Sequence, residues 1–414
     1  MQTRAGDPGA FAHFDLHRVD SPAFVIDAAK LRANLQILAD IRDAADIKVL
    51  AALKAFSMWS VAPIVGEYLD GVCASGLWEA RLASEFYDGE IATYCAAYKP
   101  DELAEVCRLS DHVIFNSPGQ LERYAPILEA ARASGQHFDV GLRINPLCPC
   151  GEVPRYDPSS PGSRLGFPID QLTPEIMAQV NGIHFHNLCE QDFEPLKRTW
   201  DSVFDAIEPY FGNLKWINMG GGHHVTRADY QREELVEFLR DAKEDTGAEI
   251  YLEPGEAVAL DAGILVGTIL DSHWNGQSVA IVDISATCHM PDVIEAPYRP
   301  AMLNEPPASP REGGDLSVPG ASFEEVPASA GTHEVTRIGG PSCLAGDVIG
   351  DYRLPVPSEP GERIAFLDQA HYSMVKTNTF NGVQLPSIWL WDSESDTLDQ
   401  VKSFGYEDFR DRLS

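Results

Sequence analysis

The sequence predicts an α/β fold, a (β/α)8 barrel of the TIM type followed by a C-terminal β-rich domain. Two observations support the barrel: short apolar runs alternate with helix-period segments through the first two thirds of the chain, and eight such runs occur there. Strands covered on both faces by helical crossovers appear as apolar runs of this kind. The third observation, which supports a separate β-rich domain, is that the helical period fades after about residue 260. Eight units favour closure into a barrel, with an open doubly wound sheet as the alternative.

Each expected barrel strand is short and mostly apolar. The candidates are residues 47–54, 72–75, 90–96, 112–117, 138–145, 182–187, 214–219 and 249–253, preceded by an early strand at 22–27. Helical segments between them, such as 118–135, 193–211 and 228–247, repeat apolar residues at three- and four-residue spacing. Pro118 after Ser117 is typical of a helix start, with serine at the cap.

The expected domain boundaries follow from this change of pattern. Residues 22–265 are expected to form the barrel, and residues 266–414 together with 1–21 the β-rich domain. Within the second domain, the strand candidates are 278–285, 362–369 and 386–392. Residues 304–331 are rich in Pro, Gly, Ser and Glu, and we interpret them as a long exposed insertion.

The charge of the chain excludes several kinds of partner. Its 414 residues include 31 Lys and Arg against 63 Asp and Glu, a net charge of −32. Nucleic acid and anionic membrane surfaces are therefore not expected as partners, because both are bound through basic residues. Two explanations of the acidity stay open: a salt-rich cytoplasm that screens self-repulsion, and a cationic substrate.

The cysteines and the hydropathy point to the cytoplasm. The eight cysteines show no framework spacing, so we expect reduced thiols. No stretch approaches the roughly 18 apolar residues of a membrane span. The N-terminal residues lack the apolar segment of a signal peptide. We expect a cytoplasmic protein.

Polar and glycine residues gather at the carboxyl ends of the expected strands. In a (β/α)8 barrel the active site lies at this end, so these residues are expected to share one mouth. They are Lys54, Ser75, Arg143, Asn145, His184, His186, Gly220, Gly221, Gly222, His223, His224, Glu253 and Glu256.

Three of these features together indicate one cofactor. Lys54 can be a surface charge, or an amine of lowered pKa that forms a Schiff base with an aldehyde. The glycines at 220–222 can be a plain turn, or a run of free N–H groups for a phosphate. A lysine, a glycine-rich cradle and the carboxylate Glu253 fit pyridoxal 5′-phosphate, with Glu253 on the pyridine nitrogen and His186 stacked on the ring.

The histidines also allow a metal site, which we do not expect. His184 and His186 can be a core pair, or zinc ligands with His223, His224 or Cys189. No second motif with ligand spacing completes them, and Cys148-Pro149-Cys150 is too short for a zinc knuckle.

The chain resembles the fold-type III pyridoxal phosphate decarboxylases, which combine an alanine-racemase-like barrel with a C-terminal β domain. The resemblance rests on the order and spacing of motifs spread over nearly the whole chain. They are ALKAF around Lys54, CASG at 73–76, GLRINP at 141–146, FHN at 185–187, GGG at 220–222, EPGE at 253–256, GGPSCLAGD at 339–347 and DQAHYSMVKTNTFNG at 368–382.

Two departures from better-known members indicate the substrate. Diaminopimelate and ornithine decarboxylases carry Arg after Glu-Pro-Gly, where this chain has Glu256, and Glu or Asp after the catalytic Cys, where it has Leu344. Those positions contact the distal ends of the smaller substrates. The segment 285–300 also is similar to the members that decarboxylate carboxylated polyamines. The resemblance therefore implies a carboxylated triamine as substrate.

The resemblance also implies roles for single residues. Lys54 would hold the cofactor, Glu253 would keep the ring nitrogen protonated, and Cys343, reaching the site from the partner subunit of a homodimer, would reprotonate the α-carbon. Tyr372 and the glycines at 220–222 would bind the phosphate, with Arg143 close by. Glu256, Asp292 and Asp347 are the expected partners of the cationic substrate, although in a chain with 63 acidic residues they can also be solvated charges.

Three rival functions stay open. The chain can be a decarboxylase of diaminopimelate, ornithine or arginine. It can be an inactive relative that regulates, although such a protein would be expected to lose Lys54, Cys343 or the glycine run. It can also be a zinc hydrolase on a barrel, provided that the histidines converge.

Overall fold

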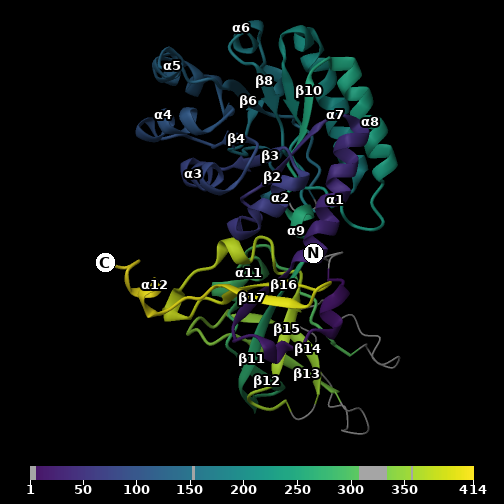
Figure 1. Cartoon of the computed structure of the whole chain (residues 1–414), viewed down its shortest axis with the longest axis vertical. Coiled ribbons are helices and arrows are strands. Elements are labelled where there is room, and N and C mark those ends of the chain that lie inside the picture. The colour runs from purple at the N-terminus through teal and green to yellow at the C-terminus, as the bar shows by residue number, and fades with distance from the viewer. Residues whose placement is uncertain (1–5, 152–153, 307–332, 356–357) are drawn as a thin grey trace. The chain divides into compact units, whose positions relative to one another are not determined.

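A computed structural model describes residues 6–151, 154–306, 333–355 and 358–414 (Figure 1). The chain divides into two compact units, one of residues 28–260 and one of residues 1–27 and 261–414. All but the first three residues of the expected insertion at 304–331 lie outside the described residues. Within the described part, no helix is both long enough and apolar enough to cross a membrane.

The first unit is a closed barrel of eight parallel strands, as the sequence predicted. The strands follow one another in the order β5-β4-β3-β2-β10-β9-β8-β6, and pairing of β5 with β6 closes the ring. The short strand β7 (Phe167–Pro168) adds to β6 outside the ring. The ring strands are β2 (Lys48–Ala52), β3 (Gly71–Ala74), β4 (Glu90–Tyr94), β5 (His112–Phe115), β6 (Asp139–Asn145), β8 (Gly182–His184), β9 (Trp216–Asn218) and β10 (Glu249–Leu252).

Helices cover the outside of the barrel (Figure 1). The sequence explains where several of them begin and end: α5 has Pro118 in its first turn, and α8 stops at Gly247, whose φ of +66° suits a residue without Cβ. Ser117 takes the cap position of α5, but its side chain makes no capping hydrogen bond. The helices are α1 (Ala28–Ala45), α2 (Ala62–Tyr68), α3 (Leu77–Phe86), α4 (Pro100–Leu109), α5 (Pro118–Ala133), α6 (Pro174–Met177), α7 (Phe193–Ile207), α8 (Arg232–Thr246) and α9 (Glu256–Ala259).

One large side chain fills the barrel interior. Trp216 on β9 is buried, and its indole stacks on the His112 ring at a centroid distance of 4.6 Å. A Cβ on Gly182 would lie 2.1 Å from the indole of Trp216, and one on Gly141 would lie 2.4 Å from it. The two glycines therefore provide the space that Trp216 occupies, and the packed interior holds β6, β8 and β9 in register.

The second unit is built on a mixed sheet in the order β14-β13-β12-β11-β1-β16-β17, with β15 paired to β11. Short helices accompany it: α10 (Ala286–His289), α11 (Asp292–Glu295) and α12 (Tyr406–Arg410). The strands are β1 (Ala23–Asp27), β11 (Gly263–Trp274), β12 (Ser278–Val282), β13 (His333–Gly339), β14 (Val348–Pro355), β15 (Arg363–Leu367), β16 (Ser387–Asp392) and β17 (Thr397–Lys402). The three strands predicted for this domain are present as β12, β15 and β16.

The early strand lies in this sheet and not, as expected, in the barrel unit. β1 pairs antiparallel with β11 and parallel with β16. The unit boundaries accordingly fall after Asp27 and after Leu260, and not at residues 22 and 265 as the sequence suggested. All five residues of β1 are buried, so its apolar run is indistinguishable from that of a barrel strand. Only the strands that pair with β1, which are distant in sequence, show that it belongs to the second unit.

We predict that Gly182→Ala destabilises the barrel by about 1–3 kcal/mol, because the new Cβ would overpack against Trp216. The free energy of unfolding in urea, followed by far-UV circular dichroism, measures the effect. Gly212→Ala is the matched control, because a Cβ there meets no atom within 4 Å. Equal stability of the two variants would contradict the packing argument.

Candidate active site

The candidate active site starts from Lys54, which directly follows β2. Its Nζ lies 3.1 Å from Nε2 of His186. The pKa of Lys54 is lowered chiefly because the surrounding protein removes water from the charged amine. The nearby Arg143 guanidinium lowers this pKa further. The side chain is nonetheless accessible to solvent. Lys54 thus combines an accessible amine with an environment that favours the uncharged, nucleophilic form.

The hydrogen bonds of His186 agree with a neutral amine on Lys54. The Gly221 N–H donates to Nδ1 of His186 over 2.9 Å. A neutral imidazole that accepts at Nδ1 carries its proton on Nε2, so Nε2 donates and the Lys54 nitrogen accepts. Burial is the main cause that holds the pKa of His186 well below its usual range, and the positive charge of Arg143 acts in the same direction. A neutral His186 ring with its proton on Nε2 therefore favours the uncharged form of Lys54.

Glu253, the residue after β10, is fixed by two partners on neighbouring strands. Asn218 Nδ2 donates to its Oε1 over 2.7 Å, and His184 Nε2 lies 3.1 Å from its Oε2. Burial by itself would raise the pKa of Glu253, but the contacts with His184 and Asn218 overcome it, and the net pKa is lowered. Burial also lowers the pKa of His184. The pair therefore consists of a carboxylate and a neutral imidazole that donates to it.

The three glycines after β9 are required by close backbone contacts. A Cβ on Gly221 would lie 2.0 Å from the Glu253 carbonyl oxygen, and one on Gly222 2.0 Å from the Leu188 carbonyl oxygen. Gly220 and Gly222 also have φ values of +70° and +89°, which favour glycine. The glycine run therefore lets the loop after β9 touch both the loop after β8 and the end of β10.

The glycine run offers fewer free donors than the sequence suggested. The Gly220 N–H donates to Asn218 Oδ1 over 2.9 Å, and the Gly221 N–H is taken by His186. These bonds form because the glycines bring the turn against the strand ends that carry Asn218 and His186. Two of the three expected phosphate donors therefore serve to hold the site itself.

Arg143 on β6 also organises this end of the barrel. Its side chain is only 5% exposed, and it donates to the His186 carbonyl oxygen over 2.7 Å. Its guanidinium lies 4.6 Å from the centre of the Tyr94 ring, a cation–π contact. Arg143 therefore fixes the backbone that carries the His186 ring.

Glu256 and the two histidines after the glycine run have separate partners. Glu256 opens α9, and its Oε1 lies 3.2 Å from Nε2 of the buried His224. His223 Nδ1 instead contacts the Tyr230 hydroxyl at 2.7 Å. His184 contacts Glu253, and His186 contacts Lys54. The four imidazoles therefore point to four different groups and do not converge on one point, as ligands of one zinc ion would.

In the second unit, Cys343 lies in the turn between β13 and β14. Its thiol is exposed, and its N–H donates to Asn381 Oδ1 over 2.8 Å. Asp347 at the end of this turn is 4% exposed and accepts from the Ser285 hydroxyl and the Ser342 N–H. These contacts give Asp347 a role in holding the Cys343 turn, whereas the sequence predicted contact with substrate.

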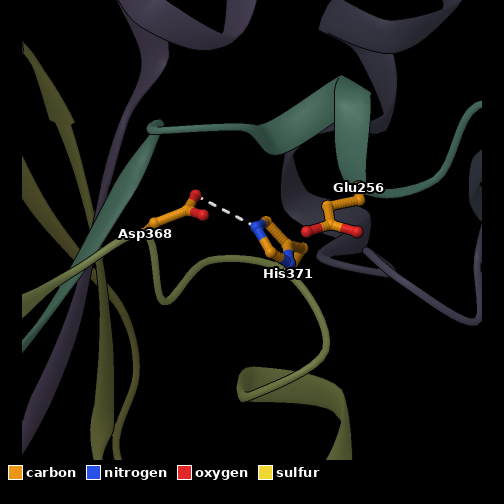
Figure 2. A group of neighbouring side chains, drawn as sticks. All are labelled: Glu256, Asp368 and His371. Atoms are coloured by element: carbon orange, nitrogen blue, oxygen red, sulfur yellow. Dashed lines mark hydrogen bonds and ion pairs between the residues drawn. The ribbon is translucent and has the colours of Figure 1, made fainter. Parts of the chain in front are cut away.

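Tyr372 lies in a loop that an Asp–His pair supports. His371 Nε2 lies 3.0 Å from Asp368 Oδ1, as Figure 2 shows, and the same oxygen accepts from the Asp261 N–H over 2.7 Å. Tyr372 itself has a φ of +46°, an unusual conformation for a residue with a side chain. The neighbouring hydrogen bonds hold this conformation.

Asp292 is the remaining predicted substrate contact. It opens α11 and forms an ion pair with Lys376, which also contacts Glu295 at 2.9 Å. Asp292 therefore already faces one cation within its own unit.

Sequence reasoning missed residues that act through the predicted ones. Asn218 orients Glu253 and the glycine turn, and Tyr94 stacks on Arg143. Burial and then the Glu253 charge hold the pKa of the Cys73 thiol well above its usual range, so Cys73 is a neutral neighbour of that carboxylate. Asn218 is the last residue of its strand, and this position at the active end of a barrel was the signal available in the sequence.

The comparisons identify the family. A family model described as "Pyridoxal-dependent decarboxylase, C-terminal sheet domain" matches residues 23–370. The chain therefore belongs to the pyridoxal-dependent decarboxylases, with the barrel and the β-rich domain expected of fold type III.

Two relatives cover almost the whole chain. It is 36% identical to the carboxynorspermidine/carboxyspermidine decarboxylase of Campylobacter jejuni over 95% of this chain and 98% of that protein. It is also 36% identical to the carboxyaminopropylagmatine decarboxylase of Synechocystis over 96% of each chain. Among solved structures, carboxynorspermidine decarboxylase of C. jejuni complexed with norspermidine matches with a TM-score of 0.82, over 95% of this chain and all of that one.

The residues at the mouth of the barrel fit the cofactor of this family. An aldehyde requires a nucleophilic amine, and the lowered pKa of Lys54 favours that form of its side chain. A protonated ring nitrogen requires a fixed carboxylate, and Glu253 is held ionised by Asn218 and His184. When bound, pyridoxal phosphate supplies a ring that accepts the electron pair of the bond that breaks.

We predict that the stability of the chain falls between about pH 7 and pH 4, in part because of His223. Burial lowers the pKa of His223 from 6.5 to about 4. Between these pH values His223 is protonated in the unfolded chain but not in the folded one. Acidification therefore favours the unfolded chain. At about 1.4 kcal/mol per pKa unit, His223 accounts for at most about 3 kcal/mol.

Urea unfolding at several pH values tests this prediction. His223→Gln is expected to be less stable at pH 7 but to lose less stability on acidification than the parent chain. His137→Gln, a change at an exposed position, is the matched control and should keep the parent's pH dependence. An unchanged pH dependence in His223→Gln would refute the assignment.

Proposed function

We propose that this chain decarboxylates carboxynorspermidine or carboxyspermidine to norspermidine or spermidine in polyamine biosynthesis, with pyridoxal phosphate as cofactor. The observation that carries the proposal is the paired arrangement of Lys54 with His186 and of Glu253 with His184 and Asn218. It occurs in a chain that is 36% identical, over nearly its full length, to a decarboxylase named for these substrates.

The roles of the barrel residues follow from their contacts. Lys54 would hold the cofactor aldehyde, and the Gly222 turn and Tyr372 would hold its phosphate. Glu253, kept ionised, would retain a proton on the ring nitrogen, which favours loss of carbon dioxide. His186 would cover the ring face. Its orientation is fixed by the Gly221 N–H, which donates to Nδ1, and by Arg143, which donates to the His186 carbonyl oxygen.

Proton return to the α-carbon would fall to Cys343. Its thiol is exposed, and the turn that carries it is held by Asp347 and Asn381. By resemblance to the family, the thiol would come from the partner subunit, so we infer a homodimer. All eight cysteines are thiols, which is consistent with a cytoplasmic protein.

The cationic nitrogens of the substrate would be bound by acidic side chains. Glu256 is the stronger candidate, because its side chain is only 14% exposed, and water and salt screen a charge pair less there than at the surface. Asp292 would act as a second contact in competition with its Lys376 partner. Asp347 would contribute by holding the Cys343 turn.

A second candidate substrate is carboxyaminopropylagmatine. It is favoured by the equal identity, 36%, to the Synechocystis enzyme named for that compound. Its agmatine part ends in a guanidinium group, which a carboxylate such as Glu256 can bind through two parallel hydrogen bonds. Both candidates are carboxylated linear polyamines, so they differ only in the distal cation.

A decarboxylation assay with all three substrates tests the proposal. Purified chain loaded with pyridoxal phosphate is mixed with each compound, and carbon dioxide release and the amine product are measured. We expect turnover of at least carboxynorspermidine or carboxyspermidine. Preference for carboxyaminopropylagmatine would establish the second candidate, and turnover only of diaminopimelate, ornithine or arginine would refute both.

We predict that Lys54→Ala abolishes decarboxylation, reducing kcat by at least about a thousandfold, because the amine that binds the aldehyde is lost. The absorbance band of lysine-bound cofactor should vanish as well. Lys197→Ala is the control, because Lys197 is exposed on α7. Retention of the absorbance band in Lys54→Ala would overturn the assignment of Lys54.

We predict that Glu256→Gln raises KM for the polyamine substrate roughly tenfold or more and leaves kcat within about threefold, because a charged hydrogen bond contributes about 1.5–3 kcal/mol. Steady-state kinetics measures both constants. Glu129→Gln, an exposed change on α5, should leave KM unchanged. A parent-like KM in Glu256→Gln would exclude Glu256 from substrate binding.

A further inference from the structure

A pair of thiols lies beyond the carboxyl end of β6. Cys148 and Cys150 are separated by Pro149, and their Sγ atoms are 3.7 Å apart. Both side chains are partly exposed, so small reagents reach them. The proposed reaction uses neither thiol, and the pair is too close in sequence for the zinc motifs considered above.

A positive charge accompanies the pair. The positive charge of Arg198 on α7 acts on both thiols. Burial, and next the neighbouring Cys150 sulfur, raise the pKa of Cys148, and Arg198 works against both. The net pKa of Cys148 stays above its usual value, so the thiolate, which is the form that attacks a disulfide, is the minor species of this thiol.

The backbone of this turn is tied to the candidate active site. Asn187, the residue after His186, donates from Nδ2 to the Cys148 carbonyl oxygen over 3.1 Å. Gln191 Nε2 donates to the Cys150 carbonyl oxygen, and the Gln191 N–H donates to the Gly222 carbonyl oxygen over 3.1 Å. A change in the conformation of the thiol turn therefore acts on the loop after β8 and on the glycine turn.

We propose that Cys148 and Cys150 form a reversible disulfide that rearranges the loop after β8. The oxidant is a low-molecular-weight disulfide such as oxidised glutathione. One thiolate attacks it, forming a mixed disulfide and releasing one glutathione thiolate. The other cysteine thiolate then attacks the protein sulfur of that bond and releases the second. The two cysteines lose two electrons and two protons, and oxidised glutathione becomes two glutathione thiols.

The disulfide changes the geometry that the reduced turn holds. The two sulfurs must approach from 3.7 Å to bonding distance, about 2 Å. The turn contains only three residues, so its carbonyl groups move with the sulfurs. The hydrogen bonds from Asn187 and Gln191 are thereby weakened, and the loop that carries His186 loses part of its support.

Peptide mass spectrometry tests the formation of the bond. Trypsin releases residues 144–155, which contain Cys148 and Cys150 and no other cysteine. The full chain is exposed to oxidised glutathione, alkylated in denaturant and digested without reduction. We expect this peptide to be unalkylated and lighter by two hydrogen atoms, and to become doubly alkylated when dithiothreitol precedes alkylation.

Matched variants separate this bond from other thiol chemistry. Cys148→Ser and Cys150→Ser should never give the lighter peptide, whereas Cys95→Ser, a change at another partly exposed thiol, should give it as the parent does. A peptide that stays doubly alkylated, or that carries only glutathione, while the exposed Cys189 is modified would overturn the proposal.

Hydrogen–deuterium exchange tests the consequence for the loop. We expect amides in residues 185–191 to exchange several-fold faster in the oxidised parent than in the reduced one, and equally under both treatments in Cys148→Ser. Unchanged exchange in the oxidised parent would refute the proposed rearrangement. These measurements need no substrate, so their outcome is independent of whether the proposed decarboxylation is correct.

Discussion

The candidate site depends on the close approach of three loops at the carboxyl end of the barrel. The glycines at 220–222 lie so near the Glu253 and Leu188 carbonyl oxygens that a Cβ would overlap them. This contact allows Asn218 to bind both the glycine turn and Glu253, and allows the Gly221 N–H to bind His186. A larger side chain in this turn would displace both Glu253 and His186, because the turn contacts both directly.

Burial sets the charge states in this region. It lowers the pKa of His184 and His186, and it favours a neutral Lys54. Glu253 stays ionised against the effect of burial because His184 and Asn218 donate to it. The same environment thus lowers the pKa of an amine and fixes a negative charge, which is the combination that a pyridoxal-dependent decarboxylase requires.

Much of the fold could be predicted because barrel strands and helices leave local periodic patterns. All eight barrel strands are present near the predicted residues, and a lysine, a glycine run and a glutamate at strand ends indicated the cofactor of the family. The local pattern failed for β1, whose burial is the same in either unit. The resemblance also implies that Asp347 binds substrate, which stays a prediction, and the contacts of its carboxylate with Ser285 and Ser342 could not be predicted from the sequence.

The sequence by itself determined the barrel and the family, and it supplied the candidate site residues, because strand periodicity and motif spacing are properties of neighbouring residues. The tertiary structure alone decided which groups meet. Asn218 contacts Glu253 from the neighbouring strand, His224 lies 3.2 Å from Glu256 on a different loop, and the charge of Arg198 acts on the thiols of a turn before β8. Such contacts arise when the barrel closes and brings strand ends together, and local sequence does not encode their distances or charge states.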